Sequence, residues 1–288
     1  MLKSIEQILK ISDEQHLPFW EVILRDDMND RLAAEEESFG QMRQMYQAMK
    51  DADASYDAAL RSASGLVGGD GEKVRLAREQ GKLLSGDFIG AVIERALKMG
   101  ESNACMKRVV AAPTAGSCGV IPAVFISVQE KQGYSDEEMT RALYVAAGIG
   151  GVIAERASIS GAAGGCQAEI GASSAMAAGG VVYLQGGDAE QIAHAAAISL
   201  KNLLGLVCDP VAGLVEVPCV KRNVIGAVNA ISAADLALAG VRSQIPADEV
   251  IDAMGAVGRQ MVPALRETGE GGLAASPTGV RVKEKLRG

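Results

Sequence analysis

Small side chains, rather than aromatic ones, make up the apolar part of this chain. Of its 288 residues, 48 % are hydrophobic and only 3 % are aromatic, while 34 are glycine. A core of Ala, Val, Ile, Leu and Met requires backbones that approach one another closely. Helical periodicity recurs along the chain, whereas the alternation typical of half-buried strands is hard to find. We therefore expect an all-α fold of closely packed Ala/Gly-rich helices with glycine-rich loops.

The helical pattern is expected to form a single domain over residues 1–288, because a chain of this length can bury one sizeable core. Residues 1–62 form a charged helical N-terminal segment in this prediction. Residues 63–85, which contain the loose run SASGLVGGDG, form a linker or hinge. Residues 86–288 form the core that carries the site.

Local capping signals predict several helix boundaries. Ser12 and Ser135 each open a capping box, and Asp188 begins a third helix. Gly100 follows the periodic run DFIGAVIERALKM and predicts the end of that helix.

Charge and cysteine usage exclude several classes of protein. The net charge is −8 and no basic stripe is present, which argues against nucleic acid as a partner. Five cysteines, an odd number, and a charged start without a signal peptide's apolar stretch predict a cytoplasmic protein. Two uncharged runs, residues 109–128 and 170–187, are long. Prolines and hydroxyls interrupt the first, so we expect buried core segments and no membrane contact, with a membrane bundle as the alternative.

Three cysteines lie in two glycine-rich signatures. Cys166 follows GAAGG. Cys208 comes 42 residues after Cys166, and Cys219 comes 11 residues after Cys208, at the two ends of CDPVAGLVEVPC. Three thiolates brought together by folding can hold a [4Fe–4S] cluster and leave one iron open, whereas structural zinc usually has four protein ligands. Spacing alone leaves open that these are ordinary buried thiols. The adjacent prolines predict rigid loops, and the KRN run of residues 221–223 supplies donors for a negatively charged group or an exposed surface.

A third segment combines short hydroxyls with a glycine turn that suits a carboxylate. Its candidate substrate-binding residues are Ser102, Asn103, Thr114, Ala115, Gly116 and Ser117. Cys105 and Cys118 lie in the same segment, and we expect them to pack rather than to ligate. The two histidines, His16 and His194, are expected to be structural. A general base would then come from elsewhere, including another polypeptide.

The chain resembles the α chain of bacterial iron–sulfur-dependent L-serine dehydratases in four segments: APTAGSCGVIPA, ASISGAAGGCQAEIG, LKNLLGLVCDPVAGLVEVPCVKRN and ALRETGEGGLAASPTG. The resemblance runs from about residue 85 to the C-terminus. It implies a [4Fe–4S] cluster held by Cys166, Cys208 and Cys219, and no pyridoxal phosphate. The implied activity is an ammonia-lyase of serine catabolism and gluconeogenesis, which eliminates water from L-serine to give pyruvate and ammonia through aminoacrylate.

The resemblance also implies a partner. A separate, smaller β chain would assemble with this one, in a higher oligomer, and would contribute a histidine near the site. The open iron would bind the serine carboxylate and β-hydroxyl, and the turn with Ser102 and Asn103 would hold the carboxylate or the ammonium group.

Two other interpretations stay open. A pyridoxal-phosphate hydroxy-amino-acid dehydratase would use Lys107 or Lys201 for the Schiff base and GAAGG as a phosphate cup. A non-catalytic iron–sulfur sensor would use the cysteines without turnover.

Overall fold

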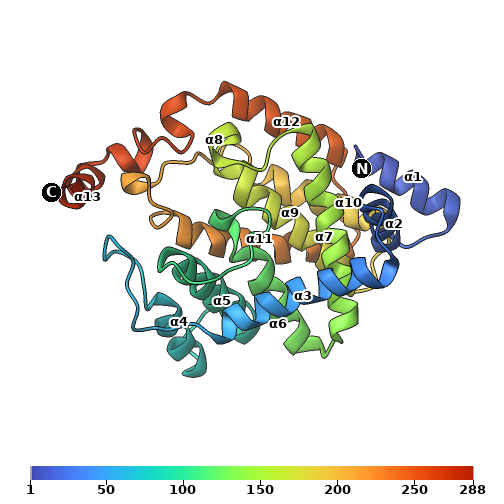
Figure 1. Cartoon of the computed structure of the whole chain (residues 1–288), viewed down its shortest axis with the longest axis horizontal. Coiled ribbons are helices and arrows are strands. Elements are labelled where there is room, and N and C mark those ends of the chain that lie inside the picture. The colour runs from blue at the N-terminus through green and yellow to red at the C-terminus, as the bar shows by residue number, and fades with distance from the viewer. Residues whose placement is uncertain (1, 288) are drawn as a thin grey trace.

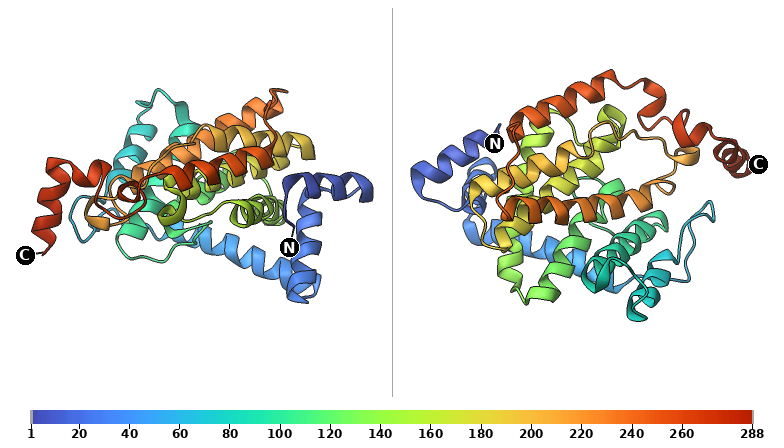
Figure 2. Two further views of the ribbon diagram at one scale, coloured as in Figure 1. Left: turned by 90° about the horizontal axis from the view of Figure 1, so that it is seen from above. Right: turned by 180° about the vertical axis from the view of Figure 1, so that it is seen from behind.

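The computed structural model describes residues 2–287, which form helices joined by loops, with no strand in that range. The all-α prediction is confirmed. The α-helices are α1 (Ile5–Gln15), α2 (Phe19–Arg31), α3 (Glu35–Ala54), α4 (Asp70–Glu79), α5 (Gly86–Ala104), α6 (Val120–Gln132), α7 (Asp136–Arg156), α8 (Gly161–Gly164), α9 (Ala172–Leu184), α10 (Ala189–Lys201), α11 (Cys219–Leu238), α12 (Ala247–Gln260) and α13 (Pro277–Arg287). Figure 2 shows α1 and α13 at opposite ends of the molecule.

Helix α9 is the centre of the core. It packs against α6, α7, α10 and α11, which surround it in Figure 1. All of its residues except Tyr183 are buried, as expected for a helix that is apolar on every side. Glycine makes this crowding possible, because a Cβ on Gly179 would lie 2.3 Å from Ile149 Cδ1 and one on Gly180 would lie 2.3 Å from Phe125 Cζ. The helix therefore gives the site a rigid, closely packed foundation.

Buried hydroxyls and an amide tie α9 to its neighbours. Ser174 Oγ donates to Gly226 O at 2.6 Å and accepts from Ser199 Oγ at 2.8 Å. Asn229 Nδ2 donates to Ser174 Oγ at 2.9 Å. The network satisfies polar groups in an otherwise apolar core and fixes α9, α10 and α11 relative to one another.

The helix starts predicted at Ser135 and Asp188 are confirmed, and both are full capping boxes. The start predicted at Ser12 is wrong: Ser4 caps α1, and Ser12 lies within that helix. The helix end predicted at Gly100 is also wrong, because α5 continues to Ala104. Gly100 serves packing instead, since a Cβ there would lie 3.1 Å from Val220 Cα on α11.

Residues 63–85, expected as a linker or hinge, contain α4, which packs against α5. Its first N–H groups are capped by a distant side chain: Glu101 accepts from Asp70 N at 2.7 Å and from Gly71 N at 3.2 Å. Tyr56 Oη donates to the same carboxylate at 2.5 Å. One glutamate on α5 therefore fastens both ends of the connection that precedes α4.

The uncharged run over residues 109–128 is divided between an irregular loop, a short 3-10 turn and α6. None of the helices described between residues 2 and 287 combines the length and apolarity that spanning a bilayer requires.

Candidate active site

The three motif cysteines come from three different local structures. Cys166 precedes a π-helical turn, η2 (Gln167–Gly171), that leads into α9, and Cys219 is the first residue of α11. Cys208 lies on the connection between α10 and α11. All three are free thiols and are at most 8 % exposed. The structure gathers them where the starts of two helical segments meet one loop.

Their electrostatics show that the three thiols are neighbours. Burial raises the pKa of Cys166 and of Cys219 to about 12, and the charge of Cys166 adds to the effect on Cys219. Burial also raises the pKa of Cys208, and the charges of Cys166 and Cys219 both contribute. Thiolates would therefore need a cationic partner here. Among the described residues, no three Cys, His, Asp or Glu side chains form a site for a single metal ion.

Cys105 and Cys118, which we expect to pack rather than to ligate, have other surroundings. Cys118 Sγ donates to Met99 O at 3.7 Å within the core, and Cys105 stands at the C-cap of α5. We use the term three-cysteine site for Cys166, Cys208 and Cys219.

Arg222 is the cation of the three-cysteine site. Its guanidinium interacts with the Cys166 thiol and lowers the pKa of both Cys166 and Cys219, against the larger effect of burial. It also donates to Asp209 Oδ1 at 2.8 Å and to Val207 O at 2.7 Å, the residues on either side of Cys208. Arg222 thereby fixes the Cys208 loop to the first turn of α11. Lys221, its neighbour, is exposed and pairs with Asp70 at 3.1 Å.

Asn223 joins the three-cysteine site to the predicted substrate turn. Its Oδ1 accepts from Gly119 N at 2.8 Å, and its Nδ2 donates to Gly116 O at 2.9 Å and to Cys219 O at 3.0 Å. The side chain is buried, so these bonds replace the ones that water would make. The turn and the start of α11 are therefore held as one unit.

The Thr114–Ser117 turn (3-10 turn η1, Ala115–Ser117) has its hydroxyls already engaged. Ser117 is fully buried and forms a local capping box with Thr114. Thr114 Oγ1 donates to Glu169 Oε1 at 2.7 Å. A Cβ on Gly116 would lie 3.2 Å and 3.3 Å from the two Glu169 carboxylate oxygens. The carboxylate of Glu169 thus lies directly against the turn.

Ser102 and Asn103 occupy the last turn of α5, where Ser102 is buried and Asn103 is half-buried. Gly100, one turn earlier in the same helix, contacts Val220, the residue after Cys219. This end of α5 therefore lies beside the start of α11.

Two carboxylates at the site were not singled out by the sequence. Glu169 comes three residues after Cys166, and Glu267 lies in the ETGEGG run. A Cβ on Gly161 would lie 2.8 Å from Glu169 Oε2, 3.0 Å from Cys208 Sγ and 3.2 Å from Glu267 Oε2. The position of Glu169 in the Cys166 motif was the available signal, whereas nothing local to Glu267 indicates which group it faces.

The C-terminal segment (residues 262–276) pairs with the Cys208 loop. Cys208 N donates to Leu265 O at 2.9 Å, and Glu267 N donates to Cys208 O at 2.7 Å. Leu273 N donates to Asp209 Oδ2 at 2.8 Å. These bonds tie the Cys208 loop to the C-terminal segment, in addition to its bonds with Arg222.

The remaining predicted groups lie elsewhere. His16 ends α1 and lines an open groove with Asp13 and Asp188, while His194 is half-buried in the second turn of α10. Lys107 is exposed, and Lys201 Nζ donates to Ser243 Oγ at 3.0 Å.

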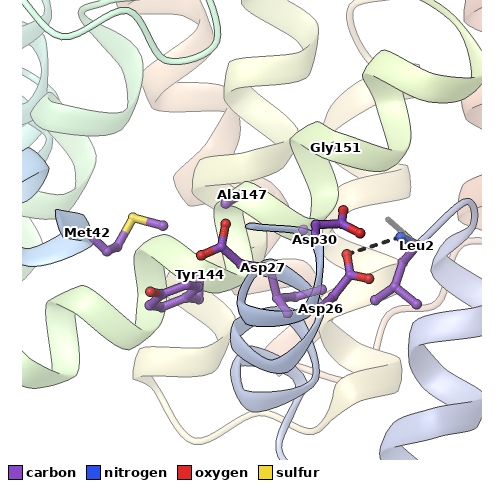
Figure 3. A pocket seen from close by; sticks show the side chains of 10 residues that line it. Leu2, Asp26, Asp27, Asp30, Met42, Tyr144, Ala147 and Gly151 are labelled. Carbon is purple, nitrogen blue, oxygen red and sulfur yellow. Dashed lines mark hydrogen bonds between the residues drawn. The ribbon is translucent and has the colours of Figure 1, made fainter. Parts of the chain in front are cut away.

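A cavity of about 170 Å³ lies between α2, α3 and α7, and no cysteine lines it. Figure 3 shows Asp26, Asp27 and Asp30 of α2 around it, with Tyr144 and Met42 beside them. Leu2 N donates to Asp26 Oδ2 at 3.2 Å. None of the predicted site residues lines this cavity, so the three-cysteine site is the candidate active site.

The fold and site define an all-α protein built around a buried group of three free cysteines. The family profile described as serine dehydratase alpha chain matches residues 14–274. The chain is 48 % identical over 288 residues to the probable L-serine dehydratase, alpha chain, of Bacillus subtilis, covering all of this chain and 96 % of that one. It is 40 % identical over 294 residues to the L-serine dehydratase, alpha chain, of Peptoniphilus asaccharolyticus, covering 98 % and 97 %. The chain therefore belongs to the serine dehydratase alpha chain family.

A longer relative matches in part. L-serine dehydratase 1 of Escherichia coli is 45 % identical over 181 residues, which is 62 % of this chain and 40 % of that protein.

Proposed function

We propose that this chain is the alpha subunit of an iron–sulfur-dependent L-serine dehydratase, an ammonia-lyase that converts L-serine to pyruvate and ammonia. Two relatives of nearly the same length carry the name L-serine dehydratase, alpha chain, and support the substrate and the reaction. The observation that carries the proposal is that three free, buried cysteines lie close enough for their charges to act on one another.

The residues present fit a [4Fe–4S] cluster held by Cys166, Cys208 and Cys219. Burial raises the pKa of all three thiols, so cationic irons would supply the charge that thiolates require. Gly161 has no side chain to press on Cys208, since a Cβ there would lie 3.0 Å from the sulfur. Three cysteine ligands would leave one iron of such a cluster open. The bound cluster would then supply a Lewis acid that makes hydroxide a better leaving group.

The chain's own side chains would bind and orient the substrate. The Thr114–Ser117 turn, with Ala115 and Gly116 between, lies against Glu169 and is fixed to Cys219 through Asn223. Ser102 and Asn103 lie at the end of α5, beside the start of α11. We assign these groups to holding the carboxylate and the ammonium of L-serine, so that the Cα–H and the β-hydroxyl are aligned for elimination.

Elimination also requires a base for the Cα proton. Loss of that proton and of the hydroxyl gives aminoacrylate, which tautomerises to an imine and hydrolyses to pyruvate and ammonia. Neither His16 nor His194 lies in the cysteine motifs, so we assign the base to a separate beta chain. The word alpha in the relatives' names, and the longer Escherichia coli relative that this chain matches over 40 % of its length, support such a partner.

We further propose that the alpha and beta chains form a higher oligomer in the cytoplasm, without nucleic-acid or membrane partners. Its place would be serine catabolism, with pyruvate available for gluconeogenesis.

The test is co-purification of this chain with its beta chain under strict anaerobiosis, followed by iron, sulfide and pyruvate assays. We expect close to four iron and four sulfide per alpha chain. Pyruvate formation from L-serine should be lost in air and restored by ferrous iron and thiol. Activity without iron, together with a borohydride-trapped adduct on Lys107 or Lys201, would establish the pyridoxal-phosphate chemistry instead. A complete cluster without serine turnover would indicate a sensor.

A further inference from the structure

Glu169 and Glu267 border the three-cysteine site, and neither carboxylate has so far been assigned to the substrate or to the cluster. Both carboxylates approach Gly161, where a Cβ would lie within 3.2 Å of each of them and of Cys208 Sγ. A thiol of the three-cysteine site and two carboxylates therefore lie around one glycine that has no side chain. The pair is part of that site rather than an isolated acidic patch.

Glu169 is oriented by its surroundings. Thr114 Oγ1 donates to Oε1 at 2.7 Å. Gly116 lies so close to the carboxylate that a Cβ there would come within 3.2 Å and 3.3 Å of its two oxygens, which is tighter than an ordinary packing contact. Its backbone belongs to η2, whose preceding residue is Cys166. With Oε1 held by Thr114, Oε2 is the oxygen that faces Gly161 and the Cys208 thiol.

Glu267 reaches the same space from a backbone conformation that is uncommon for its residue type. Its φ is +64°, in the left-handed region that costs a non-glycine residue about 1 kcal/mol or more. The conformation is held by the bond from Glu267 N to Cys208 O, at 2.7 Å. The chain thus tolerates strain at the residue whose carboxylate faces the thiol.

The charge around Glu169 is not compensated within the chain. Burial raises the pKa of Glu169 and the Glu267 charge raises it further, while the Thr114 hydroxyl offsets part of this. No lysine or arginine in the described part of the chain contributes to that balance. Arg222, the nearby cation, is bound to Asp209, Val207 and the Cys166 thiol. Two carboxylates in such a position favour a cation between them.

We propose that Glu169, assisted by Glu267, binds the α-ammonium group of the substrate and so selects an amino acid over a hydroxy acid of the same size. The inference rests on the proposed function and sharpens it. The Thr114–Ser117 turn then serves the ammonium end through Glu169, because a substrate carboxylate placed there would face the Glu169 charge. The carboxylate of the substrate belongs on another side of the site, where Ser102 and Asn103 are available.

The experiment compares ligands with and without the ammonium group on the anaerobic alpha/beta holoenzyme. L-Serine and L-glycerate, which has a hydroxyl in place of the ammonium, are measured by equilibrium binding and by steady-state kinetics, with iron and sulfide content measured alongside. In Glu169→Gln we expect L-serine to bind between about 10-fold and 100-fold more weakly, the range of one charge-assisted hydrogen bond. Binding of L-glycerate should stay the same or strengthen, and iron content should equal that of the wild type.

Further variants give independent readings. Glu169→Asp keeps the charge and should restore most of the preference for L-serine. Glu267→Gln, at an exposed position where folding is not at stake, should shift the preference in the same direction by a smaller factor. Glu270→Gln is the matched control, an exposed carboxylate three residues away, and should change nothing.

Equal weakening of L-serine and L-glycerate in Glu169→Gln, or an unchanged preference in both Gln variants, would overturn the inference. Loss of iron in Glu169→Gln would overturn it too, since the carboxylate would then serve the cluster. A wild-type holoenzyme that carries the cluster but does not turn over L-serine would instead refute the proposed function, and the inference with it.

Discussion

Cys166 and Cys219 stand at the starts of helical segments that run into the core, whereas Cys208 lies on a loop that is held by hydrogen bonds. We call Cys166 and Cys219, with η2 and the start of α11, the inner half of the site. In this half η2 and α11 pack closely, since a Cβ on Gly226 of α11 would lie 2.8 Å from Ile170 Cγ2 in η2. We call the Cys208 loop and the groups that bind it the outer half. The position of this loop depends on hydrogen bonds with Arg222 and with the C-terminal segment. Two of the three cysteines are therefore positioned by the fold itself, and the third by a few polar contacts added to it.

The difference matters for how the molecule responds to change. Packing in the inner half is shared with the global core, so a substitution there should lower the free energy of unfolding. The bonds of the outer half join one buried loop to Arg222 and to the C-terminal segment, so their loss should impair the site while the helices of the core stay folded. Substitutions in the two halves should therefore affect the free energy of unfolding and the activity to different degrees.

Removal of one thiol should have the largest effect. In Cys208→Ser we expect iron and sulfide to fall to background and pyruvate formation to fall by about 10³-fold or more, because the proposed Lewis acid is lost. The free energy of unfolding of the iron-free chain should change by less than about 1 kcal/mol, because Cys208 lies on the hydrogen-bonded loop of the outer half. Metal analysis, a pyruvate assay and urea unfolding of the iron-free protein measure these quantities.

Cys105→Ser is the control, since Cys105 lies at the C-cap of α5 and should leave iron and activity unchanged. Equal iron content in the Cys208 and Cys105 variants would contradict the assignment of the ligands.

Asn223→Leu should have the largest effect on stability. It removes bonds to Gly119 N, Gly116 O and Cys219 O at a buried position, and it leaves the Gly119 N–H and the Gly116 carbonyl without these partners. We expect the free energy of unfolding to fall by about 3 kcal/mol, measured by circular dichroism in urea. Asn202→Leu is the comparison, because Asn202 is exposed and its side chain donates to Asn229 Oδ1 at 2.9 Å. If the two variants unfold at the same urea concentration, the inner half is not anchored through Asn223.

Gly272→Ala should separate the site from the fold. Gly272 has φ +56°, and a Cβ there would lie 2.4 Å from Asp209 Oδ2, so the Asp209 carboxylate must move away from Leu273 N and Arg222. We expect activity to fall by about 10-fold or more, because displacements of this size at a site are costly. Stability should fall by only about 1 kcal/mol from the positive φ.

Gly205→Ala has the same backbone penalty, with φ +85°, but its Cβ would meet nothing within 4 Å. It should lower stability by the same amount and leave activity intact. Loss of activity in both variants would show that backbone strain at the substituted glycine, rather than displacement of Asp209, affects the site.

The sequence predicted the features that depend on neighbouring residues. The helix starts at Ser135 and Asp188 follow from side chains three residues apart, and the absence of strands follows from periodicity. Gly100 was misread because a glycine that ends a helix and one that admits a neighbouring helix look alike in sequence. Helix α4 was missed because Glu101, 31 residues away, caps it.

The site divides in the same way. The motifs and the family resemblance pointed to Cys166, Cys208 and Cys219, which the structure places together; their binding of a cluster stays a prediction. Glu169 and Glu267 were not singled out, because what makes them notable is that both lie, with Cys208, around Gly161, which has no side chain. Such a three-body arrangement has no local signature, and only the folded chain reveals it.

The smallest effect should come from an ion pair outside both halves of the site. Lys50 Nζ lies 2.8 Å from Asp136 Oδ2, joining α3 to the start of α7, and both side chains are partly exposed. The hydrogen bond from Lys50 lowers the pKa of Asp136, with Gln129 contributing. Lys50→Met should lower the free energy of unfolding by about 0.5 kcal/mol at pH 7 and leave iron content and activity unchanged.

The pH dependence of that cost follows from the direction of the shift. Because the folded protein lowers the pKa of Asp136, the ion pair contributes its stability above the carboxyl's ordinary pKa. That contribution is lost as pH falls below about 4 and through the lowered pKa. Urea unfolding of wild type and Lys50→Met should therefore converge in acid. A cost that persists there would show that Lys50 acts through packing on the Tyr46 ring, 5.2 Å from its nitrogen, rather than through its charge on Asp136.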